Sequence, residues 1–109
     1  MKLKVKTYLK NSSETLENIY EATKEDNKII YQDCNTLVTI DLSGKIKREN
    51  NEYCLEIDLI NNKGYYLLKD NGFNLDLKIK TKSLISTNQI LKTEYSIESE
   101  IILFEIKEV

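Results

Sequence analysis

Residues 73–82 read FNLDLKIKTK, and apolar and polar side chains alternate along them. Successive side chains of an extended strand point to opposite faces, so residues two apart share a face. One face then carries Phe73, Leu75, Leu77 and Ile79. The other face carries Asn74, Asp76, Lys78, Lys80 and Lys82. This pattern predicts a strand with one buried and one solvated face.

The same alternation recurs on both sides of this stretch, and turn-forming residues separate the runs. Asparagine, aspartate and glycine tolerate the positive φ of tight hairpins, and they cluster at 25–27, 43–44, 50–51, 61–64 and 70–72. A further turn signal, Ser86-Thr87-Asn88, lies nearer the end of the chain. Short strands at this regular spacing, with no long helical stretch between them, indicate an antiparallel meander.

We therefore predict an all-β fold: one domain, residues 1–109, forming a closed or nearly closed antiparallel meander barrel of eight to ten strands. The strands are expected over 2–9, 14–24, 28–33, 35–42, 45–49, 52–60, 64–69, 73–85, 89–98 and 100–108. The predicted core contains Leu3, Val5, Val38, Ile40, Leu55, Ile57, Leu75, Leu77, Ile79 and Phe104.

In two segments the apolar pattern departs from simple alternation. In residues 11–24, Leu16, Ile19 and Tyr20 also fit helical spacing, but the flanking strands favour a strand. Near residues 99–101 the parity of the apolar positions changes, from Tyr95 and Ile97 to even-numbered residues. That change predicts a β-bulge or a bend.

Composition excludes several classes of function. The chain has no histidine, no proline and three glycines, so histidine-dependent catalysis, histidine-ligated metals and glycine-rich phosphate loops are not expected. The formal net charge of −2 favours neither nucleic acid nor an anionic membrane. The apolar runs are too short to span a bilayer, and the N-terminus does not resemble a signal peptide. We expect a cytoplasmic protein without metal or cofactor, in which Cys34 and Cys54 are free thiols.

The order of the elements resembles that of a known family. The resemblance rests on the N-terminal run Lys4-Val5-Lys6-Thr7-Tyr8-Leu9, the Glu14-Thr15 opening of the next strand, Ile29-Ile30-Tyr31 and the ending Phe104-Glu105-Ile106-Lys107. On this arrangement the chain resembles the YwiB-like family of uncharacterised bacterial proteins. The resemblance implies a calycin-like β-barrel, and it brings no catalytic residues because the activity of that family is unassigned.

Tyrosine supplies the candidate ligand site. The chain has seven tyrosines, two phenylalanines and no tryptophan. A tyrosine offers apolar area together with one hydroxyl that can orient a ligand. We expect Tyr53, Tyr65, Tyr66 and Tyr95 to line the barrel mouth, although tyrosines on strands also serve as half-buried packing residues.

Charged rows are weaker candidates. Lys78, Lys80 and Lys82 share a strand face and could hold phosphate or an acidic partner, but Glu94 and Glu98 are expected opposite them and would neutralise the row. Carboxylates also recur at Glu56/Asp58 and at Glu94/Glu98/Glu100. Such pairs could serve acid–base chemistry or bind a hard cation, but on a polar strand face they are more often solvated.

With no catalytic constellation, we expect a non-enzymatic barrel that binds a small, largely apolar ligand in or at its mouth. The alternative is a protein–protein interaction or assembly module that uses an exposed strand edge. No specific nucleic-acid or membrane partner is expected.

Overall fold

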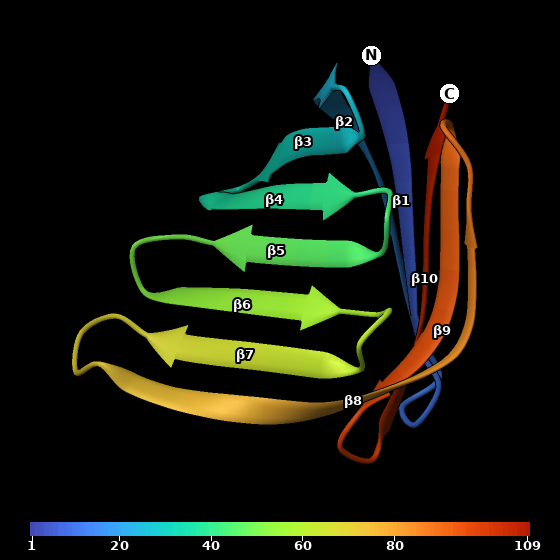
Figure 1. Cartoon of the computed structure of the whole chain (residues 1–109). Helices are drawn as coiled ribbons and strands as arrows, with labels where there is room; N and C mark the ends of the chain where they lie inside the picture. The colour runs from blue at the N-terminus through green and yellow to red at the C-terminus, as the bar shows by residue number, and fades with distance from the viewer.

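The fold is an all-β barrel, as the alternation predicts, and a computed structural model describes residues 1–109 (Figure 1). Ten strands make it up: β1 (Lys2–Leu9), β2 (Glu14–Glu25), β3 (Lys28–Asp33), β4 (Thr36–Asp41), β5 (Lys45–Glu49), β6 (Tyr53–Asp58), β7 (Lys63–Leu68), β8 (Phe73–Ser86), β9 (Ile90–Ile97) and β10 (Glu100–Glu108). The segment open to a helical interpretation is strand, since β2 covers most of it. No helix in the structure is long and apolar enough to cross a membrane.

Every strand pairs antiparallel with its neighbours in sequence, and β1 also pairs with β10, which closes the barrel. The two termini consequently lie side by side, and the Val109 amide donates a hydrogen bond of 2.9 Å to the Lys2 carbonyl. The barrel is therefore closed through the ends of the chain, while the middle of the chain forms the continuous meander β3–β7.

The strands form two sets that cross at a steep angle, and the long strands β2 and β8 belong to both (Figure 1). In β8, residues 73–78 pair with β7 and residues 79–86 pair with β9. In β2, residues 14–21 pair with β1 and residues 22–25 pair with β3. Each of these strands turns a corner of the barrel, and each half of it pairs with only one neighbouring strand.

The bulge lies in β8 rather than near residues 99–101. The register between β8 and β9 shifts between Thr81 and Ser83, close to the corner, where a bulge helps a strand to bend. The change of parity after Ile97 has a different cause. Ile97 pairs with Glu100 across a two-residue turn, in which Glu98 has a φ of 56°. A tight hairpin changes the parity without any bulge, so this prediction was wrong about position.

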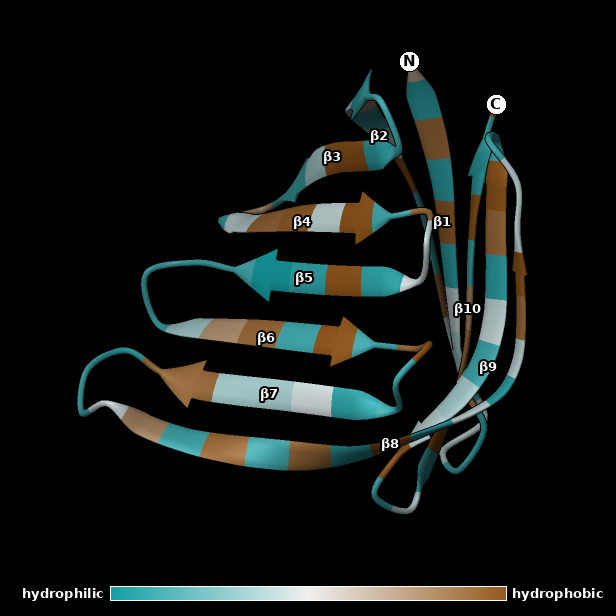
Figure 2. Ribbon diagram, viewed as in Figure 1, coloured by the Kyte–Doolittle hydropathy of each residue, from teal (hydrophilic) through white to brown (hydrophobic).

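The core is formed by one face of nearly every strand. Its buried apolar residues are Leu3, Val5, Ala22, Ile29, Tyr31, Val38, Ile40, Leu42, Ile46, Ile57, Leu59, Ile79, Leu91, Tyr95, Phe104 and Ile106. Figure 2 shows the alternation of apolar and polar residues along β8 that places one face inside.

Seven of the ten predicted core residues are buried, and three are not. Leu55 and Leu77 are partly buried and pack against the core. Leu75 is 48% exposed, so its assignment to the core was wrong. Leu75 does share the inward face with Leu77 and Ile79. It lies in the half of β8 that pairs with β7, before the strand turns the corner to pair with β9, and there its side chain is about half exposed.

Candidate functional site

Two of the four candidate tyrosines lie together. Tyr53 on β6 and Tyr66 on β7 point into the barrel, and their rings stack with centroids 5.7 Å apart and planes inclined by 26°. Tyr53 is paired with Leu68, and Tyr66 is paired with Leu55 and Leu75. The stacked pair is therefore set in a sheet surface that is otherwise apolar.

The other two candidates lie elsewhere. Tyr95 on β9 is buried in the core, where it has no access to a rim. Tyr65 is paired with Glu56 and Asp76, which lie on the outer face of the sheet. Because Tyr65 and Tyr66 are adjacent in one strand, they must point to opposite faces. The structure thus brings Tyr53 and Tyr66 together and separates Tyr65 and Tyr95 from them.

Around the stacked pair, the inward face of the barrel is open to solvent. Phe73 and Leu75, on the neighbouring strand β8, are 52% and 48% exposed. Tyr53, Leu55, Tyr66 and Leu68 are all only partly buried. We call the inward face made by Tyr53, Leu55, Tyr66, Leu68, Phe73 and Leu75 the mouth face. It is a contiguous apolar surface on β6–β8, because these residues oppose one another across the strands.

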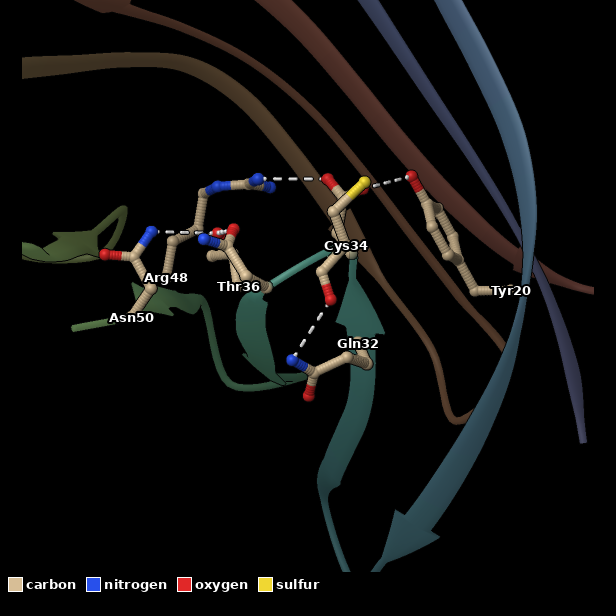
Figure 3. A network of polar contacts seen from close by, with 8 residues as sticks. Tyr20, Gln32, Cys34, Thr36, Arg48 and Asn50 are labelled. Carbon is tan, nitrogen blue, oxygen red and sulfur yellow. Dashed lines mark hydrogen bonds and ion pairs between the residues drawn. The ribbon is translucent and has the colours of Figure 1, made fainter. Parts of the chain in front are cut away.

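A polar group that the sequence analysis missed lies beside the mouth face. Arg48 on β5 is paired with Leu55 on one side and with the buried Val38 on the other, so it points inward. A terminal guanidinium nitrogen of Arg48 donates to Oδ2 of Asp33 at 3.0 Å, and the Tyr20 hydroxyl donates to Oδ1 of Asp33 at 3.1 Å. Figure 3 shows Arg48 and Tyr20 reaching from opposite sides toward the end of β3.

The same end of the barrel holds a second polar contact and a second aromatic pair. Asn50 donates from its side-chain amide to the hydroxyl of the buried Thr36 at 3.0 Å. The rings of Tyr20 and Tyr31 stack with centroids 4.7 Å apart. The ring stacking with Tyr31 and the hydrogen bond to Asp33 hold Tyr20 on β2 against β3, although the two strands are not paired at that level.

Arg48 remains charged in this setting. Burial opposes the charge of its guanidinium, but the hydrogen bond to Asp33 and the nearby Tyr53 hydroxyl outweigh the burial and raise the pKa of Arg48. A signal for the residue was present in the sequence: Arg48 is the only arginine among 16 cationic side chains. It also shares the parity of Ile46 in a predicted strand, which indicates an inward position.

The buried tyrosines predict a loss of stability in alkali. Burial raises the pKa of Tyr95 to about 12 and also raises that of Tyr31, from an ordinary value of 10.0. The folded state therefore favours neutral phenols. The resulting stabilisation is fully present below pH 10 and is lost as the pH rises toward 12. We expect the free energy of unfolding in urea to fall steeply between pH 10 and pH 12.

The control for this pH dependence is Tyr95→Phe, which cannot ionise. Lysine side chains also titrate in this range, so some slope will remain in the variant. A slope as steep in Tyr95→Phe as in the wild type would show that Tyr95 does not carry the effect.

Two hollows lie on outer faces of the barrel. One, of about 440 Å³, lies over β3–β8 and is lined by charged residues together with Tyr65. The other, of about 370 Å³, lies over β1, β10 and β9 and is lined in part by Lys6, Tyr8 and Glu105. Neither is lined by Tyr53, Tyr66 or Tyr95, and the mouth face is instead open at Phe73 and Leu75, which are about half exposed.

The lysine row on β8 is only partly paired. Lys82 lies 3.5 Å from a carboxylate oxygen of Glu94, as expected. Glu98 instead accepts a hydrogen bond of 3.2 Å from the backbone amide of Lys78. Lys80 is exposed and forms no ion pair in the structure. The bulge after Thr81 breaks the register that would have aligned the two rows.

The other charged candidates are used for surface contacts. Glu56 lies 3.7 Å from Lys47 on the neighbouring strand. Asp58 accepts hydrogen bonds from the amides of Ile60 and Asn61, both at 3.1 Å, and so fixes the turn before β7. Both cysteines are free, Cys34 exposed and Cys54 buried, which confirms the expectation for the thiols.

Together these features define the chain as a ten-stranded antiparallel meander barrel with a partly open apolar mouth and one arginine directed inward. Among solved structures it is similar to the YwiB protein from Bacillus subtilis, with a TM-score of 0.54 and 13% sequence identity. The match covers 99% of this chain and 90% of that one. The resemblance expected from the order of strands is therefore supported at the level of the fold. No protein-family model matches the chain, and no curated protein does.

Proposed function

We propose that this protein is a non-enzymatic, cytoplasmic binding protein that holds a small, largely apolar molecule on the mouth face. We further propose that it belongs to the YwiB-like family and that its barrel is calycin-like. The family proposal is supported by a structural match along nearly the whole chain.

The observation that carries the binding proposal is the exposure of side chains that point inward. In a barrel whose interior is filled, inward residues of a central strand are covered, as Ile79 is. Leu75, four residues before Ile79 on the same face of β8, is about half exposed. Contiguous exposed apolar surface is costly in a soluble protein and commonly marks a binding site.

The stacked tyrosines add a means of orienting the bound molecule. Tyr53 and Tyr66 offer aromatic area for an apolar group, and each carries a hydroxyl that can donate or accept a hydrogen bond. Since the mouth face is open rather than enclosed, we expect moderate affinity and tolerance of different ligand shapes.

The alternative, docking of another protein on a strand edge, rests on β2 and β8, because each half of these strands pairs with only one neighbour. Residues 14–21 of β2 carry Glu14, Glu17 and Glu21. Charged residues on an unpaired edge are a common defence against strand addition. This charge favours the ligand proposal over the edge proposal.

The test uses Nile red, a neutral apolar dye whose emission rises in apolar surroundings. We expect saturable binding to the wild type and at least about tenfold weaker binding to Leu75→Lys, since a charge on the mouth face must be desolvated by the dye. The matched control is Ile85→Lys, which introduces the same charge on the outer face of the same strand, where Ile85 is 59% exposed. It should bind the dye as the wild type does.

Circular dichroism should confirm that both variants fold. The proposal is contradicted if the wild type shows no saturable binding, or if the two lysine variants lose binding equally. The second result would place the dye somewhere other than the mouth face.

A further inference from the structure

Arg48 is directed into the barrel next to the mouth face. It is the only arginine of this protein, whose other cationic side chains are fifteen lysines. A guanidinium is not interchangeable with an ammonium group: its planar fork of five N–H donors matches a carboxylate in two-point contact. An interior cation next to apolar surface requires a reason, because burial of a charge is costly.

Asp33 compensates the charge of Arg48 in part, but it accepts only one hydrogen bond from the guanidinium. One terminal nitrogen of Arg48 contacts one oxygen of Asp33, and the other oxygen of Asp33 is taken by Tyr20. Arg48 and Asp33 are about a third exposed, at 33% and 31% of their side-chain surfaces. No side-chain donor in the structure is buried without a partner, so the nitrogens of Arg48 that make no hydrogen bond are not fully buried. The Asp33 contact thus orients the guanidinium and leaves donors accessible.

The mouth face runs directly from this cation. Arg48, Leu55, Tyr66 and Leu75 oppose one another on four consecutive strands, β5 to β8. Neighbouring strands lie about 4.8 Å apart, so the row extends roughly 14 Å from the backbone of Arg48 on β5 to that of Leu75 on β8. A cation at one end of an apolar row is complementary to a molecule with an anionic head and an apolar tail.

Resting on the function proposed above, we propose that Arg48 binds the carboxylate head of an amphipathic ligand, with a medium-chain fatty acid as the chemical class, whose tail lies along Leu55, Tyr66 and Leu75. Charge-assisted contacts to a carboxylate are stronger than neutral hydrogen bonds, and the two-point geometry gives the head a fixed direction. The Tyr53 hydroxyl lies close enough to Arg48 to raise its pKa, and it offers the head a second polar group. Asp33 is then a positioning residue whose charge competes with that of the ligand.

The test compares decanoate with decan-1-ol, which has the same tail and a neutral head. We expect the wild type to bind decanoate roughly tenfold or more tightly than decan-1-ol, the effect of at least one hydrogen bond to a charged group. Arg48→Gln should abolish this preference, because it weakens decanoate binding far more than decan-1-ol binding. Asp33→Asn should strengthen decanoate binding, because it removes the competing carboxylate while keeping an acceptor for Arg48. A purely structural Asp33–Arg48 pair would not produce that gain.

Nuclear magnetic resonance gives a readout that does not require a variant to fold. Arg48 is the only arginine, so its Nε–H resonance needs no assignment. It should shift on addition of decanoate to the wild type and stay in place with decan-1-ol. If both ligands bind equally and the resonance stays in place, the role of Arg48 is overturned while the proposed function stands. If neither ligand binds, the proposed function fails and this inference fails with it.

Discussion

Leu91→Ala should lower the free energy of unfolding by about 2–5 kcal/mol, the range measured for truncation of fully buried leucines. Leu91 lies in β9 between Ser86 of β8 and Ile106 of β10, and its side chain is 0% exposed. The neighbouring strands are held by backbone hydrogen bonds and cannot move inward to fill the space. The loss therefore includes both the transfer of the removed atoms and a residual cavity. Urea denaturation monitored by circular dichroism measures it.

The matched control is Leu75→Ala, in which the same side chain is truncated on the same inward face of the barrel. Leu75 is about half exposed, so the loss should stay below about 1 kcal/mol. Equal losses at the two positions would contradict the exposed mouth face, because they would mean that Leu75 is covered in solution. The pair thus tests the fold and the binding surface together.

The strands could be predicted closely from the sequence because an antiparallel barrel imposes one simple rule on it. Each strand has an inside and an outside, so apolar residues recur at every second position, and short turns must contain residues that allow a reversal. The rule holds even for β2, where only Tyr20 and Ala22 of the central residues are inward and at least half covered. Its flanking strands required a partner there, and that outweighed the helical spacing.

The extent of burial could not be predicted from the same rule. Alternation shows which way Leu75 and Ile79 point, and both do point inward. Their different exposure depends on where β8 leaves one set of strands for the other, which is set by pairing between residues far apart in sequence. Parity within one strand carries no information about that crossing.

The candidate site was predicted only in part, because the polar residues were not assigned to the inner or outer face of their strands. Tyr65 and Tyr66 are adjacent, so the predicted strand over 64–69 already required them to face opposite sides. The same rule would have placed Arg48 inside, on the parity of Ile46, beside the stacked tyrosines. Both corrections follow from treating polar residues with the same periodicity that located the apolar ones. A polar residue at an inward position is the more informative observation, since it carries a cost that packing alone does not repay.

Gly44→Ala should be the most damaging single-methyl change in the turns, with an expected loss of about 2–4 kcal/mol. Gly44 lies in the turn from β4 to β5 at a φ of +122°, beyond the left-handed region near +50° to +70° that asparagine and aspartate can adopt. A Cβ at this position would come within 2.9 Å of Cγ1 of Ile60 and 3.2 Å of Cδ2 of Leu84. The backbone is fixed on both sides, because the Gly44 amide donates to Asp41 at 2.9 Å and its carbonyl accepts from Leu59 at 2.8 Å. The turn therefore cannot relax without losing those contacts.

Two variants separate the backbone strain at Gly44 from the crowding. Gly72→Ala adds a methyl group at a φ of +66° with no atom within 4 Å, and it should cost only about 1 kcal/mol. Adding Ile60→Ala to Gly44→Ala removes the nearest contact but leaves φ unchanged, so it should restore part of the loss, measured relative to Ile60→Ala alone. Thermal and urea denaturation of the wild type and the four variants give the values. Equal losses in Gly44→Ala and Gly72→Ala would contradict the strained turn. Full restoration in the double variant would assign the whole effect to Ile60. Partial restoration is the expected result, because a φ of +122° excludes a side chain whether or not a neighbour is in the way.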